Sequence, residues 1–356
     1  MENGQVTEVF VLTDNLNVPQ RQTYNASRDM SLGCDFQPNA EMRREFRRRL
    51  LRWYDCHKRD LPWRRSREPY RVWLSEIMLQ QTRVAVVIEY YRRFLKRFPT
   101  VHELAKARTA SVLAAWSGLG YYRRALMLHA AAKKIVGQHG GEFPRTSQEL
   151  RVLPGVGRYT AGAIASIACG EAVAALDGNV ERVLQRIQGR RADRKQLWQV
   201  AENLVSRSRP GDFNQAMMEL GATLCLPRQP ECLKCPVAKL CAARGPIGDL
   251  TRKKRRKREI YYTLDCRNGS VFLVQRPRDV SLMPGMWELP EAGSWLDKSP
   301  KDFTLRHSIT VTDYVVRISR QPAPGGTKGR WVTRSELQQL ALTGLSRKIL
   351  RAAKII

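Results

Sequence analysis

Acidic residues are scarce in this sequence of 356 residues, which has 33 Asp and Glu against 62 Lys and Arg. The formal net charge of +29 predicts a polyanionic partner, with nucleic acid favoured over an anionic membrane. The sequence also lacks an apolar run of membrane-spanning length, and no basic stretch followed by an apolar one opens it. We therefore expect no membrane span and no secretory leader.

Cysteine is sparse outside one cluster. Four of the eight cysteines are scattered along the chain: Cys34, Cys56, Cys169 and Cys266. The other four stand close together, with six, two and five residues between them: Cys225, Cys232, Cys235 and Cys241. This distribution favours a reducing compartment and a metal site over a disulfide framework. Zinc ribbons usually carry two C-x-x-C pairs, so the single pair suits a cubane iron–sulfur cluster better.

The length predicts more than one domain, because a single core rarely grows this large. Residues 1–40 are polar and aperiodic, and we expect a loose tail there. Residues 41–250 carry helical patterns without a convincing strand, which predicts an all-α domain. Residues 251–259 include a run of seven basic side chains and are interpreted as a linker with added phosphate contact. Residues 260–356 predict a small α+β domain.

Apolar spacing and turn residues predict individual elements inside these two domains. Helices are expected at 42–53, at 72–95 as two helices, and at 105–116, 122–136, 161–168, 180–187, 196–205 and 213–224. A short helix is expected after Thr146, which with Glu149 makes a capping box. Strands are expected at 260–264, 271–274 and 314–318, and further helices at 335–340 and 346–353.

The segment Leu153–Gly157 reads as a tight apolar hairpin that opens a helix. Gly155 and Gly157 let the chain turn sharply, and the free N–H groups of the helix that follows can bind one phosphate. Asp177 stands just before another amphipathic segment, where its local interpretation is a helix N-cap. One short supersecondary unit therefore supplies both a candidate phosphate-binding turn and a carboxylate.

Together these motifs resemble the endonuclease III superfamily of helix-hairpin-helix DNA glycosylases with a 4Fe-4S cluster, and within it the MutY family of adenine DNA glycosylases. The resemblance runs from about Leu61 to Cys241 and continues weakly beyond. It is carried by LPWR (61–64), WLSEIMLQQT (73–82), GLGYY (118–122), DGN (177–179) and FNQAMME (213–219). It implies a base excision repair enzyme that flips adenine out of duplex DNA where adenine is mispaired with 8-oxoguanine or guanine.

The chemistry of adenine release needs one protonated carboxyl and one ionised carboxylate, because adenine leaves poorly unless protonated and the sugar becomes positive. By resemblance Glu76 is the acid and Asp177 the carboxylate, with Asn179 holding Asp177. Apolar neighbours would raise the pKa of Glu76, although in isolation it would pass for a surface carboxylate. Tyr159 stands where strand-cutting relatives have a lysine that forms a Schiff base, so a monofunctional hydrolase is expected.

The resemblance also implies residues that contact the flipped base and its partner. Gln81 and Tyr121 would fill or wedge the base stack, with Thr82 and Leu119 lining the same region. The residues similar to the adenine pocket of the family are Trp63, Arg64, Leu79 and Glu219.

The C-terminal domain resembles the Nudix-like domain that reads 8-oxoguanine in this family. QRP (275–277) and GMWELP (285–290) carry this weaker match, and no Nudix box is found, so the domain is expected to bind and not to hydrolyse. Ser308 and Thr310 are candidate hydroxyls for the lesion. Val311 stands where the family often has a histidine, which leaves the details of lesion reading open.

Two other interpretations remain at this stage. One is a thymine or uracil mismatch glycosylase, which can also carry a tyrosine after the hairpin but does not need Glu76. The other is a DNA-binding protein without activity, against which the pair of Glu76 and Asp177 argues. We expect a monomer, located in the cytoplasm at the nucleoid if the source is bacterial and in the nucleus if it is eukaryotic.

Overall fold

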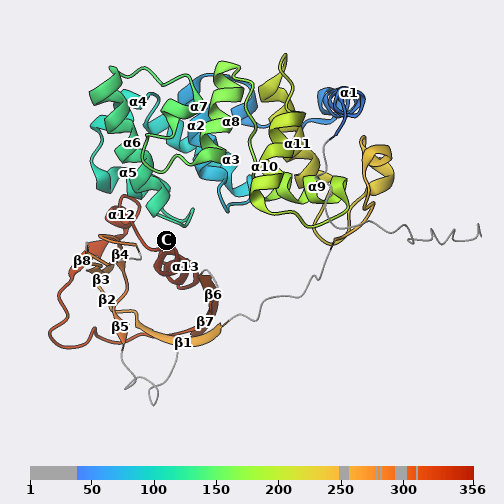
Figure 1. Cartoon of the computed structure of the whole chain (residues 1–356). Helices are drawn as coiled ribbons and strands as arrows, with labels where there is room; N and C mark the ends of the chain where they lie inside the picture. Colours follow the sequence, from blue (N-terminus) through green and yellow to red (C-terminus); the bar gives the residue numbers. More distant parts are fainter. Residues whose placement is uncertain (1–37, 248–255, 278, 281–282, 293–302, 310–311) are drawn as a thin grey trace, which may run out of the picture. The chain divides into compact units, whose positions relative to one another are not determined.

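The computed structural model describes residues 38–247, 256–277, 279–280, 283–292, 303–309 and 312–356 (Figure 1). Most of the expected N-terminal tail and the first part of the basic run lie outside these residues, as do Thr310 and Val311. None of the described helices has the length and apolar character needed to cross a membrane.

Helices make up the described region from Ala40 to Leu240, as the sequence predicts. They are α1 (Ala40–His57), α2 (Pro69–Leu79), α3 (Val84–Arg97), α4 (Val101–Lys106), α5 (Thr109–Trp116), α6 (Arg123–His139), α7 (Ser147–Leu150), α8 (Arg158–Cys169), α9 (Gly178–Gln188), α10 (Arg194–Leu204) and α11 (Pro210–Thr223). A 3-10 turn, η1 (Pro62–Arg64), lies between α1 and α2, and two more follow α11, η2 (Cys232–Lys234) and η3 (Ala238–Leu240).

Two boundaries in this region differ from the sequence prediction. The helix expected at 105–116 is divided, because Ala107 and Arg108 adopt extended backbone and separate α4 from α5. Helix α6 continues past Gly137 and ends at Gly140, whose left-handed conformation (φ 60°) closes the helix as glycine commonly does. The capping box of Thr146 and Glu149 forms as predicted at the start of α7.

The helical region has two hydrophobic cores. One lies among helices α2 to α8 and includes the fully buried rings of Trp73, Phe94 and Trp116. The other joins α1 to helices α9–α11 and includes Phe46 and Leu50. Helix α8 packs against α2 on one side and α11 on the other, so it connects the two halves seen at opposite ends of the helical region in Figure 1.

The described residues after Arg256 form an α+β region with two small sheets. Its strands are β1 (Arg256–Thr263), β2 (Cys266–Arg267), β3 (Ser270–Gln275), β4 (Trp287–Glu288), β5 (Glu291–Ala292), β6 (Phe303–Ile309), β7 (Thr312–Ser319) and β8 (Arg330–Thr333). The order is β5-β1-β7-β6 in one sheet and β2-β3-β4 in the other, where β8 also pairs with β3. Helices α12 (Arg334–Leu337) and α13 (Gly344–Ala352) complete it.

The start of this region differs from the prediction, because β1 begins at Arg256, inside the stretch 251–259 interpreted as a linker. Residues Arg256–Glu259 pair in parallel with Thr312–Val315 of β7, while their side chains stay exposed. Pairing with a distant strand can thus place charged residues in a sheet although their local sequence does not predict a strand. The sequence likewise does not predict strands β2, β4, β5, β6 and β8.

Glycine at position 162 is predicted to be required for the packing of α8. A Cβ atom there would lie 2.3 Å from the carbonyl oxygen of Ala174, so Gly162→Ala is expected to lower the free energy of unfolding by roughly 1–3 kcal/mol. Gly137→Ala is the matched control, since Gly137 is inside α6 with open space around it, and it should stabilise by about 0.5–1 kcal/mol. Urea denaturation measures both, and equal stability of Gly162→Ala and wild type would contradict the packing.

Candidate active site

A buried glutamate and a partly buried tyrosine meet at the centre of the site. Glu76 lies in α2 with 5% of its surface exposed, and Tyr159 lies in the first turn of α8. The Tyr159 hydroxyl is 2.7 Å from Glu76 Oε2 and 3.3 Å from the sulfur of Met218. Burial raises the pKa of Glu76 to about 7, against the opposing effect of the Tyr159 hydrogen bond. Glu76 can therefore hold or release a proton near neutral pH.

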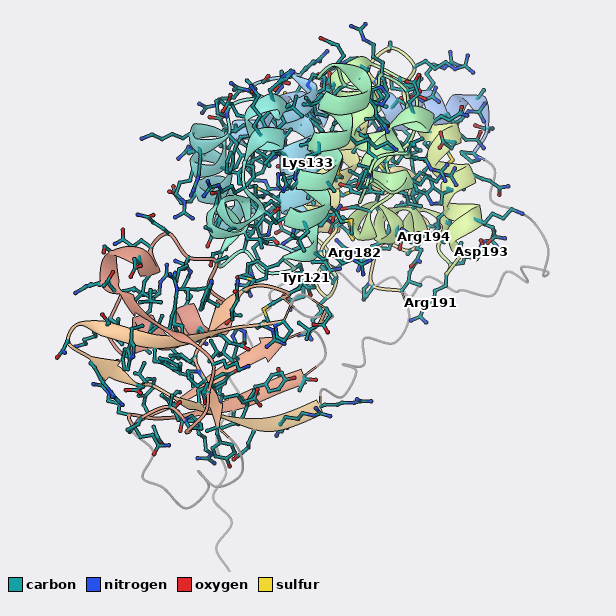
Figure 2. The ribbon with its side chains drawn as sticks, turned by 90° about the vertical axis from the view of Figure 1, so that its left-hand side faces the viewer. Tyr121, Lys133, Arg182, Arg191, Asp193 and Arg194 are labelled. Carbon is teal, nitrogen blue, oxygen red and sulfur yellow. The ribbon has the colours of Figure 1, made fainter. Side chains whose placement is uncertain are left out.

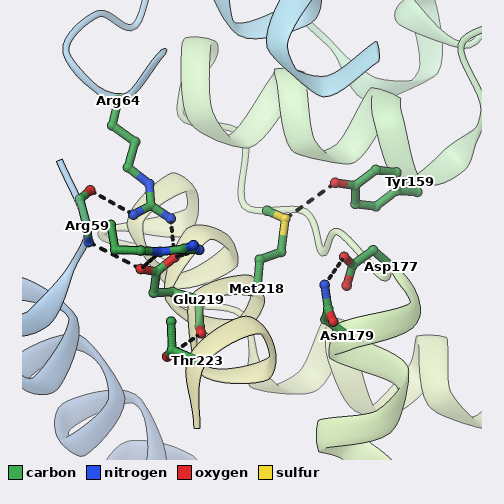
Figure 3. A network of polar contacts seen from close by, with 8 residues as sticks. All are labelled: Arg59, Arg64, Tyr159, Asp177, Asn179, Met218, Glu219 and Thr223. Carbon is green, nitrogen blue, oxygen red and sulfur yellow. Dashed lines mark hydrogen bonds and ion pairs between the residues drawn. The ribbon is translucent and has the colours of Figure 1, made fainter. Parts of the chain in front are cut away.

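Asp177 is fixed at the N-terminus of α9, where it acts as the N-cap expected from local sequence (Figure 3). Its Oδ1 accepts from the Val180 N–H at 2.7 Å, and its Oδ2 accepts from the Asn179 amide at 3.1 Å. Burial raises the pKa of Asp177, and these two hydrogen bonds oppose the rise. The negative charge of Asp177 also contributes to the raised pKa of Glu76, so the two carboxyls share one electrostatic environment.

The hairpin before α8 positions Tyr159. Gly155 has φ 75°, and a Cβ there would lie 2.7 Å from the Cβ of Met127, so this position requires glycine. Gly157 is the N-cap of α8 and has open space around it; its neighbourhood offers the helix no side-chain cap. Both glycines are exposed, so the first N–H groups of α8 remain available to an anion such as phosphate.

A second buried glutamate, Glu219 in α11, behaves in the opposite way to Glu76 (Figure 3). Only 1% of its side chain is exposed, and it accepts hydrogen bonds from Arg59 (2.7 Å) and Arg64 (2.7 Å). Burial alone would raise the pKa of Glu219, but the two guanidinium groups outweigh it and hold the pKa at about 2. Glu219 therefore stays ionised and ties Arg64 in η1 to α11.

The remaining predicted pocket residues surround this network at different depths. Trp63 is buried with its ring edge against Tyr91, at 5.6 Å between centroids, and Leu79 is half-buried at the end of α2. Sequence reasoning missed Arg59, which stands in no motif, and gave no role to Met218, although Met218 lies within FNQAMME (213–219). Only the fold brings them to Glu219 and Tyr159.

Two predicted wedge residues lie on exposed turns. Gln81 follows α2 with φ 55°, and Tyr121 precedes α6 with φ 48° and 47% of its surface exposed (Figure 2). Thr82 is half-buried beside Gln81. Leu119 differs from these residues, because its side chain is packed in the core. A left-handed backbone at a residue other than glycine is a strained arrangement that clusters at functional sites.

The four clustered cysteines line one cavity together with Arg186. The Arg186 guanidinium lies 3.2 Å from the sulfur of Cys225, and the Cys241 thiol donates to the Arg186 carbonyl at 3.2 Å. Among the described residues no three ligating side chains converge closely enough for a single metal ion. A cubane cluster spreads its thiolate ligands over four irons, so its cysteines stand farther apart than around one zinc. Four cysteine thiols on one cavity are the donor set that a 4Fe-4S cluster takes.

One arginine connects this cysteine loop to the site carboxylate. Arg182 in α9 donates to the carbonyl oxygen of Cys225 (2.8 Å) and to Oδ1 of Asn179 (2.9 Å), whose amide in turn donates to Asp177. Sequence reasoning missed Arg182, although it lies three residues after Asn179 on the same helix.

In the α+β region the structure describes only one of the two candidate lesion contacts. Ser308 is exposed in β6, and its hydroxyl donates to Asp313 Oδ1 at 2.6 Å in the paired strand β7. The connection between these strands, with Thr310 and Val311, lies outside the described residues.

The Tyr159 hydroxyl is predicted to lower the pKa of Glu76. Tyr159→Phe removes a hydrogen bond that favours the ionised carboxylate, so the pKa of Glu76 should rise above its wild-type value of about 7. Carbon-13 NMR titration of glutamate carboxyls measures this. Tyr70→Phe removes another buried phenol, which donates to Phe98 O, and should leave the pKa of Glu76 in place. An unchanged or lower pKa in Tyr159→Phe would contradict the role of this hydrogen bond.

Comparisons with known sequences show to which proteins this chain is similar. Residues 74–207 match the model of the HhH-GPD superfamily of base excision DNA repair proteins. The mouse adenine DNA glycosylase is 37% identical over 399 residues, which cover 86% of this chain and 77% of the mouse protein. The human adenine DNA glycosylase is 53% identical over 217 residues, which cover 57% of this chain. In that alignment the chain spans 40% of the human protein, and it spans 42% of the rat one.

Solved structures resemble the helical region. A thermostable thymine-DNA glycosylase is 32% identical with a TM-score of 0.53, and the match covers 57% of this chain and 96% of that protein. Endonuclease III in a non-covalent complex with DNA is 23% identical with a TM-score of 0.50 over the same shares of the two chains, which shows a common fold.

Proposed function

This chain belongs to the adenine DNA glycosylase family, and we propose that it hydrolyses the N-glycosidic bond of adenine in duplex DNA. The observation that carries the proposal is the buried Glu76, whose pKa of about 7 makes it an acid at neutral pH. It shares its surroundings with Asp177, which is held by two hydrogen bonds. One carboxyl that can donate a proton and a second that can face a cation are what adenine release requires.

The reaction divides between these two groups. Glu76 gives its proton to a ring nitrogen of the flipped adenine, and the glycosidic bond breaks with its electron pair going to the base. Asp177 stabilises the positive charge on the sugar, and Asn179 keeps Asp177 in position. The ionised Glu76 then accepts a proton from water, whose hydroxide adds to the sugar carbon. Tyr159 orients Glu76 through its hydrogen bond.

The main alternative is removal of thymine, since a solved thymine-DNA glycosylase is 32% identical to this chain. Thymine leaves without protonation by such an acid, so a thymine enzyme has no need for a glutamate held near neutral pKa. A DNA-binding protein without activity is also disfavoured, because burying a carboxyl with no cationic partner is unfavourable and is retained mainly at functional sites.

The reaction is proposed to end at an abasic site with the strand intact. A Schiff base with the sugar needs an amine, and the position after the hairpin holds the Tyr159 phenol, which donates to Glu76.

The preferred substrate is proposed to be adenine opposite 8-oxoguanine, with adenine opposite guanine as a second, and the protein is proposed to act as a monomer. Support comes from the α+β region, proposed as a Nudix-like domain, where Ser308 presents an exposed hydroxyl oriented by Asp313. Base-edge contacts are each worth roughly 1–3 kcal/mol, so one or two suffice for a tenfold to hundredfold preference.

The cysteine loop is proposed to hold a 4Fe-4S cluster through Cys225, Cys232, Cys235 and Cys241. Such a cluster closes the loop and keeps its backbone folded. Arg186 contacts the sulfur of Cys225, one of the four residues that would hold the cluster, and Arg182 hydrogen-bonds both the backbone of this loop and Asn179. The loop is therefore proposed to have a structural and positioning role.

The proposed function predicts a ranking of substrates under single-turnover conditions. Duplexes with adenine opposite 8-oxoguanine, adenine opposite guanine and thymine opposite guanine are each incubated, then analysed with and without alkali. Adenine should be released fastest opposite 8-oxoguanine, with strand breaks only after alkali. Because the acid form of Glu76 is lost as pH rises through about 7, kcat/KM should fall above that pH.

Three variants accompany this experiment: two change a site carboxyl and the third is the control. Glu76→Gln and Asp177→Asn should lose at least about 10²–10⁴-fold in rate and retain duplex binding. Glu89→Gln, which removes an exposed carboxyl from α3, should keep the wild-type rate. Release of thymine in preference to adenine, or normal rates in both site variants, would overturn the proposal.

The cluster predicts about four irons and four sulfides per chain, measured by colorimetric analysis of the purified protein. Cys232→Ser should lower the iron content, the yield of folded protein and the affinity for DNA. Cys169→Ser is the matched control, since Cys169 is an exposed cysteine at the end of α8 away from the cavity residues. One zinc per chain without sulfide would rule the cluster out.

A further inference from the structure

Two strained turns depend on a single buried cation. The turn at Gln80–Thr82 follows α2, and the turn at Gly118–Tyr121 joins α5 to α6. Each has an exposed residue other than glycine in the left-handed region, Gln81 with φ 55° and Tyr121 with φ 48°. Such conformations persist only where the surroundings hold them, so the contacts beneath the two turns must stabilise them.

The guanidinium of Arg124, in the first turn of α6, contacts both turns at once. Its Nη1 donates to the carbonyl oxygens of Ile77 (2.9 Å), Met78 (2.9 Å) and Gln80 (2.5 Å). Its Nη2 donates to Thr82 Oγ1 (3.0 Å) and to the carbonyl oxygens of Gly120 (3.1 Å) and Leu119 (3.4 Å). One rigid fork therefore fixes the distance between the turns.

The chemistry of this contact is specific to arginine. All six acceptors are neutral, and two of them are last-turn carbonyls of α2, which an arginine can cap. The guanidinium plane also lies near the rings of Trp116 (5.3 Å) and Tyr121 (5.6 Å). Lysine carries its three donors on a single nitrogen, so it cannot reproduce two nitrogens that each serve a different turn.

The position is energetically unfavourable for a purely structural cation. Arg124 is partly buried with no carboxylate among its six acceptors, its Nε has no hydrogen-bond partner, and burial lowers its pKa to about 10. It also stands at the positive end of the α6 dipole. The neighbouring Arg123, in contrast, is exposed on the same turn of the helix.

We propose that Arg124 is a positioning residue that holds Gln81 and Tyr121 in one fixed arrangement, so that both enter the base stack together when adenine is extruded. Because Arg124 also caps α2, it keeps Gln81 and Tyr121 in a fixed position relative to Glu76, which lies on that helix. The inference rests on the proposed adenine glycosylase function and assigns Arg124 to the base-flipping step, not to bond cleavage. A misplacement of about 1 Å can cost about 10²-fold in rate.

The test compares Arg124→Met and Arg124→Lys with Arg123→Met. The last variant removes the same charge from the residue that precedes Arg124. Single-turnover rates are measured on a duplex with adenine opposite 8-oxoguanine and on one with adenine opposite an abasic-site analogue, where adenine is already unpaired. Arg124→Met should be about tenfold to a hundredfold slower on the paired duplex and less than about threefold slower on the unpaired one. Arg124→Lys should show the same selectivity, and Arg123→Met should show neither loss.

A second measurement does not depend on activity. Hydrogen exchange of the amides at 80–82 and 119–121 should be faster in both Arg124 variants and unchanged in Arg123→Met. Equal losses on the two duplexes, a full wild-type rate in Arg124→Lys, or unchanged exchange would each overturn the proposal. If Arg124→Met does not fold, Arg124→Lys decides. A wild-type protein that releases no adenine overturns the proposed function instead, and the exchange data still decide whether Arg124 fixes the turns.

Discussion

The site depends on the burial of one carboxyl without a cation beside it. Glu76 and Glu219 are both almost fully buried glutamates, but the pKa of Glu76 lies at about 7 and that of Glu219 at about 2. The difference comes from their partners, since Glu219 has two guanidinium groups and Glu76 has a phenol. In a chain with a net charge of +29, keeping arginines away from Glu76 is a strong constraint on the fold.

Several arginines of the helical region are bound by acceptors other than Glu76. Arg59 and Arg64 are bound by Glu219, Arg182 by Asn179 and nearby carbonyls, and Arg124 by the turns after α2 and α5. Each of these cations is fixed by several acceptors; the charge of Arg64 still lowers the pKa of Glu76, but burial of Glu76 outweighs it. Their arrangement also joins elements that are distant in sequence, which makes the surroundings of the site rigid.

The two carboxyls are supplied by different kinds of local structure. Glu76 comes from the side of a buried helix, where apolar neighbours set its proton affinity, whereas Asp177 comes from a helix N-cap, where backbone N–H groups favour its charge. Helix α8 packs against α2, which carries Glu76, and has the hairpin at its exposed start and Tyr159 in its first turn. A phosphate bound at the hairpin would therefore be held by the same helix that orients the acid.

The sequence by itself determined the helices, the capping box at Thr146, the hairpin glycines, the N-cap role of Asp177 and the spacing of the cysteines, because each depends on residues within a few positions of one another. Only the tertiary structure decided which distant side chains meet. Tyr159 and Glu76 are 83 residues apart, and Arg59 and Glu219 are 160 apart. Local periodicity specifies which face of a helix is buried, but not which donor from a distant part of the chain will contact that face. The same reason accounts for β1 starting at Arg256 and for Arg124, whose role exists only because two turns fold over it.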